Sequence, residues 1–211
     1  MSIRKKGEEF SSGKSGKKNT YLLKGQIVSR DIGLIKNEPT ENQLPWQNRT
    51  RMVTKLLAPM LPFIRMGFEQ VSEGTTSSAY NIATSVNWHD AVKGEYPNQY
   101  IDFSTATFSK GKIPVLKDVR VEVVERGLQF TWNPNYRVRG MSGADRVMLL
   151  AYCPGMSYAY YILSGERRLK GSDLLELDPF EKNITVHTYM AFTSANRKNV
   201  STTLYTGEFL W

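Results

Sequence analysis

The sequence is poor in the residues that most often carry chemistry at protein sites. Its 211 residues include one cysteine, Cys153, and two histidines, His89 and His187. One cysteine excludes a disulfide within the chain, and one cysteine with two histidines is too few for an ordinary zinc site without carboxylate ligands. We therefore expect no metal and no other cofactor, and we do not expect an enzyme.

Long apolar runs are also missing, and we expect no secretory leader. The longest apolar run is a few residues long, whereas a membrane-spanning helix needs about 20. The stretch from Met1 to Glu9 is basic but has no apolar segment behind it, unlike a secretory signal. We expect a protein with no membrane span that is made in the cytoplasm and then becomes part of a virion or another assembled particle.

What the chain does have is a positive charge confined to its first third. Residues 1–66 hold 13 Lys/Arg and 5 Asp/Glu, a net charge of +8, and residues 67–211 hold 15 of each, a net charge of zero. This asymmetry predicts a basic arm ahead of a neutral body that folds by itself. Such an arm meets an anionic partner or lies on a neighbouring subunit.

Residues 1–38 are predicted to form this arm. Residues 21–30 predict two short strands that turn at Lys24-Gly25. A hairpin of this size is not stable alone, so we expect it to pack on the body or on another subunit. The candidates for a subunit contact are its large apolar residues: Tyr21, Leu22, Leu23, Ile27 and Val28. The candidates for a contact with nucleic-acid phosphates are its lysines: Lys5, Lys6, Lys14, Lys17, Lys18 and Lys24.

Residues 39–98 predict a small helical segment. Apolar side chains recur at helical spacing from Trp46 onward, and Pro59 and Pro62 are expected to break or kink this helix. A second helix is predicted over residues 77–92. The first helix supplies the remaining candidates for the subunit contact: Trp46, Arg49 and Arg51.

From residue 99 onward the hydrophobic period changes to two. Strand-forming residues alternate with turns at intervals of about 8–12 residues, which is the pattern of an immunoglobulin-like or fibronectin-like sandwich. The predicted strands cover residues 99–108, 117–125, 127–133, 145–152, 158–163, 173–178, 184–193 and 200–209. The predicted fold class is therefore α+β and β-dominated. It has a basic arm with a hairpin over 1–38, a helical segment over 39–98 and an antiparallel β-sandwich domain over 99–211.

Short motifs that resemble active sites lack the context that the chemistry needs. Residues 13–17 hold the glycines and lysines of a phosphate-binding loop, but at the wrong spacing and without a preceding strand. The His-Asp pair at 89–90 lacks further metal ligands, and Cys153 at a strand end favours a small buried residue over a nucleophile. Tyr158 and Tyr160 share one face of a strand, which favours core and protein interface, with carbohydrate stacking as an alternative.

The order of motifs along the chain resembles a known family. The motifs are Gly13-Lys14-Ser15-Gly16-Lys17, Tyr21, Lys24-Gly25, Pro39-Thr40 with Gln43, Arg49 with Arg51, Gly67-Phe68, Ala79-Tyr80-Asn81-Ile82-Ala83, Gly94-Glu95-Tyr96-Pro97, Ile101-Asp102-Phe103-Ser104, Ser109-Lys110-Gly111, Phe130-Thr131-Trp132 and Thr188-Tyr189-Met190-Ala191-Phe192. Over nearly its whole length the chain resembles an uncharacterised family common in Bacteroidota, classed as a domain of unknown function. The resemblance implies a bacterial or bacteriophage origin in that phylum and supplies no catalytic residues.

These features together predict a non-enzymatic structural protein that assembles with itself and with other proteins into a larger particle. A bacteriophage virion component of the head, neck or tail is the most specific form of this hypothesis. It would be a homo-oligomer whose arm adds to a neighbour's sheet edge. The alternatives are a nucleic-acid-binding protein that acts through the basic arm and a carbohydrate-binding or adhesive sandwich module.

Overall fold

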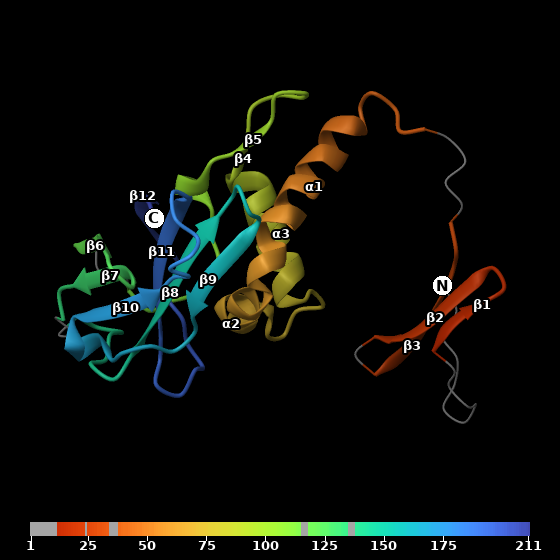
Figure 1. Ribbon diagram of the computed structural model, residues 1–211. Helices are drawn as coiled ribbons and strands as arrows, with labels where there is room; N and C mark the ends of the chain where they lie inside the picture. Colours follow the sequence, from red (N-terminus) through yellow and green to blue (C-terminus); the bar gives the residue numbers. More distant parts are fainter. Residues whose placement is uncertain (1–11, 24, 34–37, 115–117, 135–137) are drawn as a thin grey trace. The chain divides into compact units, whose positions relative to one another are not determined.

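The computed structural model describes residues 12–23, 25–33, 38–114, 118–134 and 138–211 (Figure 1). The chain divides into two compact units, which comprise residues 1–40 and residues 41–211. The first contains the predicted arm. The second contains both the predicted helical segment and the predicted sandwich, and we call it the body.

The arm forms a three-stranded antiparallel sheet in the order β1-β2-β3 (Figure 1). Its strands are β1 (Gly13–Ser15), β2 (Lys18–Leu23) and β3 (Gln26–Asp31). Leu23 pairs with Gln26, which leaves a two-residue turn, and Gly25 has a φ of +79°, a left-handed conformation that glycine adopts at little cost. The predicted hairpin is therefore confirmed, and β1 extends it by one strand.

Helices form one layer of the body: α1 (Leu44–Leu57), η1 (Ala58–Met60), α2 (Leu61–Ser72) and α3 (Ala79–Asp90). Pro45 lies in the first turn of α1, where the missing amide hydrogen costs no helical hydrogen bond. Pro59 lies in η1 and Pro62 in the first turn of α2, which confirms the break predicted at these prolines. α3 confirms the second predicted helix, and the Ser78 side chain caps it by accepting a hydrogen bond from the Asn81 backbone N–H.

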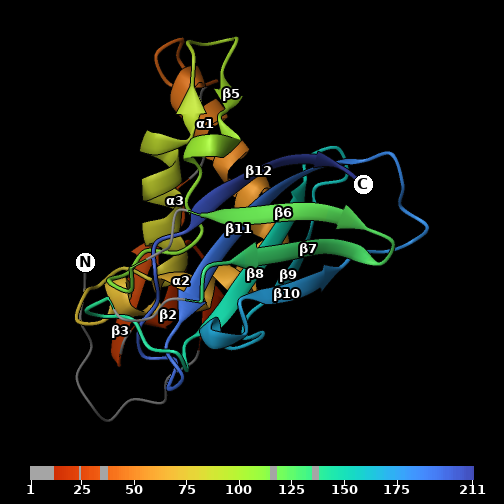
Figure 2. The same cartoon turned by 90° about the vertical axis from the view of Figure 1, so that its left-hand side faces the viewer.

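The described strands of the sandwich form two antiparallel sheets, in the orders β10-β7-β6 and β12-β11-β8-β9 (Figure 2). The first, second and fifth strands of the sandwich share one sheet, which is an arrangement of the fibronectin-like kind. The β-dominated α+β class is confirmed. The remaining elements are β4 (Val92–Lys93), β5 (Tyr100–Ile101), η2 (Phe103–Thr105), β6 (Val119–Val124), β7 (Gly127–Trp132), β8 (Arg146–Cys153), β9 (Tyr158–Ile162), η3 (Arg168–Lys170), β10 (Ser172–Glu176), β11 (Thr185–Thr193) and β12 (Leu204–Leu210).

The four-stranded sheet is buried on both faces, so the body has three layers (Figure 2). In β8, Val147, Leu149 and Ala151 belong to the hydrophobic core between the two sheets. Met148 and Leu150, which alternate with them, belong to the core between this sheet and the helices. The helices and the sandwich thus share a core, which is why they form one compact unit.

The strand predicted over residues 99–108 is wrong for most of its length. Only β5 forms a strand there, paired with β4, and the 3-10 turn η2 follows it. The Asp102 carboxylate accepts a hydrogen bond from the Ser104 backbone N–H at 3.0 Å, which offers the backbone an alternative to a sheet ladder and ends the strand.

Candidate functional site: the arm and a tryptophan cluster

The predicted contact residues of the arm lie on both faces of its sheet. Tyr21 pairs with Val28 and Leu22 pairs with Ile27. Because successive residues of a strand point to opposite faces, Tyr21, Leu23 and Val28 share one face, and Leu22 and Ile27 share the other. Leu22 and Leu23 are 57% and 48% exposed, whereas Val28 is buried. The arm therefore presents one exposed leucine on each face beside its hairpin turn.

The described lysines of the arm do not gather on one face either. Lys14 shares the face of Tyr21, Lys17 lies in the turn between β1 and β2, and Lys18 shares the face of Leu22. The other predicted phosphate contacts lie outside the described residues: Lys5, Lys6 and Lys24. The described lysines thus give the arm positive charge without concentrating it on a single surface.

Two of the candidates on α1 belong to a cluster at the surface of the body, which we call the tryptophan cluster: Trp46, Arg49 and Trp88. Trp46 is 63% exposed, and its ring stacks on that of Trp88 from α3 with 4.7 Å between the centroids. The Arg49 guanidinium lies 4.8 Å from the centroid of the Trp88 ring, and its Nη1 donates a hydrogen bond to the Trp88 carbonyl at 3.3 Å. The cation and both rings therefore hold one another in place.

Grooves lie on either side of the Trp46 ring. One follows the outer face of α1, where Arg51 and Lys55 also line it. The other lies between α1 and α3 and is lined by Trp88 and His89. An exposed, pre-positioned indole between two grooves is typical of an aromatic anchor at a protein interface. Trp46 thus lies between the other two candidates on α1: Arg49 contacts Trp88 on the side of α3, and Arg51 lines the groove on the outer face.

The single cysteine and His187 lie in packed surroundings that do not favour a catalytic role. Cys153 is buried, and burial raises the pKa of its thiol to about 11, so it is protonated at neutral pH. His187 stacks on Phe103 with 4.0 Å between centroids, and burial lowers its pKa against the opposing effect of Glu208. Across the described ranges, no three His, Cys, Asp or Glu side chains are arranged to hold a metal ion. Nor is any described helix long and apolar enough to cross a membrane.

A family model described as a family of unknown function, DUF6266, matches residues 13–207. The chain belongs to this family. The resemblance to a domain of unknown function is thereby confirmed. The DUF6266 match begins at the first residue of β1 and ends within β12, so the arm sheet and the body are both parts of the family's domain. No curated protein and no solved structure matches the chain.

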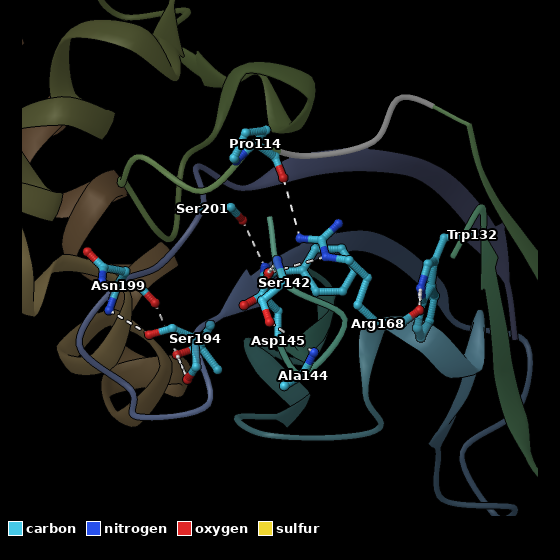
Figure 3. A network of polar contacts seen from close by, with 11 residues as sticks. Pro114, Trp132, Ser142, Ala144, Asp145, Arg168, Ser194, Asn199 and Ser201 are labelled. Atoms are coloured by element: carbon cyan, nitrogen blue, oxygen red, sulfur yellow. Dashed lines mark hydrogen bonds and ion pairs between the residues drawn. The ribbon is translucent and has the colours of Figure 1, made fainter. Parts of the chain in front are cut away.

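A buried ion pair in this DUF6266 chain was not predicted (Figure 3). Arg168 and Asp145 are both buried, with 3.3 Å between Arg168 Nε and Asp145 Oδ2. Arg168 Nη2 donates a hydrogen bond to the Pro114 carbonyl at 3.4 Å, and the guanidinium lies 3.6 Å from the centroid of the Phe192 ring. Asp145 Oδ2 also accepts a hydrogen bond from the Ser142 backbone N–H at 2.9 Å. The pair ties loops to the sandwich core, and it opens onto none of the grooves described here, so we assign it a structural role.

Sequence alone holds no signal for this pair. Arg168 follows Arg167 directly, and the two are identical in type, yet Arg168 is buried and Arg167 is exposed. The Trp46–Trp88 stack was missed for a similar reason, since its members lie on different helices and only the fold brings them together.

Proposed function

We propose that this chain is a non-enzymatic structural subunit that assembles into a larger particle, with its arm making contacts between subunits. A bacteriophage virion component of the head, neck or tail is the most specific form of the proposal. The observation that carries it is that the arm forms a compact unit of its own with exposed leucines.

The described arm is a single layer of secondary structure, which favours packing against another subunit. Stable domains pack at least two layers of secondary structure around a core, whereas the described arm is a single three-stranded sheet. Its apolar residues are divided between both faces, so neither face is left as a purely polar surface. A second layer supplied by another subunit would cover the exposed ones, Leu22 and Leu23. The family match supports an integral role for this element, because DUF6266 includes the arm sheet.

The tryptophan cluster supports the same function from the body. Trp46 stacks on Trp88, which in turn contacts Arg49, before any partner arrives, so little side-chain entropy is lost when Trp46 becomes buried. Aromatic and arginine side chains are the residue types that most often dominate the binding energy of interfaces. The body therefore offers a surface on which other proteins of the particle can dock.

Light scattering tests this proposal. The full chain is measured at about 100 µM, far above the micromolar Kd of modest interfaces, and beside it a variant that lacks residues 1–40. We expect the full chain to form a discrete assembly and the shortened chain to be a folded monomer. A full chain that stays at its monomer mass of 24.0 kDa would contradict the proposal.

Salt separates assembly from the alternative, nucleic-acid binding through the basic arm. Between about 0.1 M and about 1 M NaCl the Debye length falls from ~10 Å to ~3 Å, so contacts between lysines and phosphates weaken steeply. We expect the assembly to persist at high salt, because exposed apolar side chains contribute most of its contact. A monomer that releases bound nucleic acid as salt rises would instead support the alternative.

A further inference from the structure

On one side of the body, each sheet of the sandwich ends in a strand whose outer edge pairs with no other described strand. β9 is the last strand of the four-stranded sheet and β10 is the last strand of the three-stranded sheet. A groove lies between them, lined by Tyr158–Ile162 of β9 and Leu174–Glu176 of β10. At the other side of the sandwich β12 and β6 lie next to each other (Figure 2). We call the groove between β9 and β10 the edge groove.

The edge groove offers both backbone and side-chain contacts to an extended segment. Neither β9 nor β10 pairs with another described strand on its groove side, so backbone N–H and C=O groups line the groove without a ladder partner in the described sheets. Tyr158 is 50% exposed and packs edge-on against Tyr160, with 5.0 Å between the centroids. The Tyr160 hydroxyl donates a hydrogen bond to Glu181. The groove therefore has aromatic walls that are already held in place.

The charge at the edge groove is opposite to that of the arm. Residues 173–181, which begin on β10, contain four acidic residues and neither lysine nor arginine. Glu176 lines the groove with a side chain that is 61% exposed, and its carboxylate forms a surface ion pair with Arg126, so the remaining acidic residues of this stretch carry most of the excess negative charge. Residues 13–31 of the arm contain five Lys/Arg and one acidic residue. Complementary charge of this kind favours encounter and fixes orientation.

We infer that the edge groove is the acceptor for the arm of a second copy of this chain, whose strand β3 adds to the free edge of β9. The inference rests on the proposed function and names the surface that receives the arm. β3 is an outer strand of the arm sheet, and its second edge pairs with no other described strand. β3 has six residues and β9 has five, so their ladders match in length. The added strand places Ile27 beside the aromatic walls and the basic residues of the arm near Glu176.

Cross-linking between two full-length variants tests this inference. Ser29→Cys places a thiol on β3, and Tyr158→Cys, in a separate chain, places one on β9. The native Cys153 is buried with a protonated thiol, so a bismaleimide reaches only the engineered positions. A linker of about 10 Å spans two strand spacings and tolerates a shift in register. Since docking raises the effective concentration of the two thiols to about mM, we expect cross-linking roughly a hundredfold faster than for undocked chains at about 10 µM.

The matched control is Glu122→Cys, an exposed position on β6 at the opposite edge of the sandwich. Equal cross-linking of Ser29→Cys with Tyr158→Cys and with Glu122→Cys would overturn the inference. So would a doubly substituted chain, Ser29→Cys with Tyr158→Cys, that cross-links only within itself, because its own arm would then occupy the groove. Circular dichroism establishes that each variant is folded.

Light scattering on the same samples distinguishes failure of the inference from failure of the proposed function. Assembly without preferential cross-linking at Tyr158→Cys refutes the edge groove as acceptor and leaves the assembly function standing. A monomer without cross-linking refutes both. A charge reversal adds a second readout: Glu176→Lys is expected to slow cross-linking several-fold. Neither Arg126→Gln, which breaks the Glu176–Arg126 ion pair but keeps the carboxylate, nor Glu122→Lys, which makes the same change in charge at the opposite edge, is expected to slow it.

Discussion

Replacing Arg168 by methionine is expected to lower the free energy of unfolding of the body by about 3–5 kcal/mol. Arg168 and Asp145 are both buried, and their charged groups lie 3.3 Å apart. Without the guanidinium, the Asp145 carboxylate keeps the Ser142 backbone N–H as a partner but remains a buried charge without a counterion. Methionine is chosen because its flexible thioether side chain still fills the space above the Phe192 ring.

Urea unfolding followed by tryptophan fluorescence measures this loss. Trp132 is a suitable reporter, because its Nε1 donates a hydrogen bond to the Arg168 carbonyl at 2.9 Å and its ring is buried in the sandwich core. For a unit of this size each kcal/mol corresponds to a change in Tm of about 2–4 °C. We therefore also expect Tm to fall by about 6–20 °C.

The matched control removes both charges. Since the penalty arises from the carboxylate left behind, the double variant Arg168→Met/Asp145→Asn should recover more than half of the lost stability. Its asparagine oxygen still accepts the hydrogen bond from Ser142. A loss below about 1 kcal/mol in the single variant, or a double variant no more stable than the single one, would refute the reasoning.

Two further predictions concern pH and the arm. Burial lowers the pKa of His187 below its unfolded value of about 6.5, so the folded state binds fewer protons and stability is lost as the pH falls through and below 6.5. The midpoint of urea unfolding should therefore fall between pH 7.5 and pH 5. The fall should be smaller in His187→Gln than in the control variant His89→Gln. An equal fall in the two variants would show that His187 does not cause the pH dependence. Leu22 and Leu23 are about half exposed, so burying the remainder at a subunit contact is worth about 1 kcal/mol each. Leu22→Ser/Leu23→Ser should therefore weaken assembly roughly 30-fold in a light-scattering dilution series, and an unchanged midpoint would exclude these leucines from the contact.

Much of the fold was predictable because its strands obey local rules. From residue 117 onward the predicted strands agree with β6 to β12 to within a few residues, since alternating side chains and turn residues mark them directly. The third layer was not predictable. Residues Val147–Cys153 form a continuous hydrophobic run, which is consistent with a strand buried on both faces but does not say that helices cover the second face.

The candidate site was predictable only in part. Charge and composition marked the arm, and the hairpin at Gly25 followed from turn chemistry. The partners of Trp46 and Arg49 were not predictable, because Trp88 lies on another helix and its position depends on tertiary packing. The edge groove was not predictable from the sequence for the same reason. It lies between β9 and β10, whose proximity follows from the sheet order and not from any pattern within either strand.

The four-stranded sheet contributes to two hydrophobic cores, and this affects how the chain folds during its synthesis on the ribosome. Phe63 and Phe68 are made long before Tyr189 and Ala191, against whose face of the sheet their helix packs. At 5–20 residues/s, the interval between Phe68 and Tyr189 lasts roughly 6–24 s. During that time the sheet that covers the apolar stripe of α1 and α2 is incomplete, because its inner strand β11 has not yet been made. Each newly made copy therefore passes through a stage at which these helices need chaperones or rapid local collapse to escape aggregation.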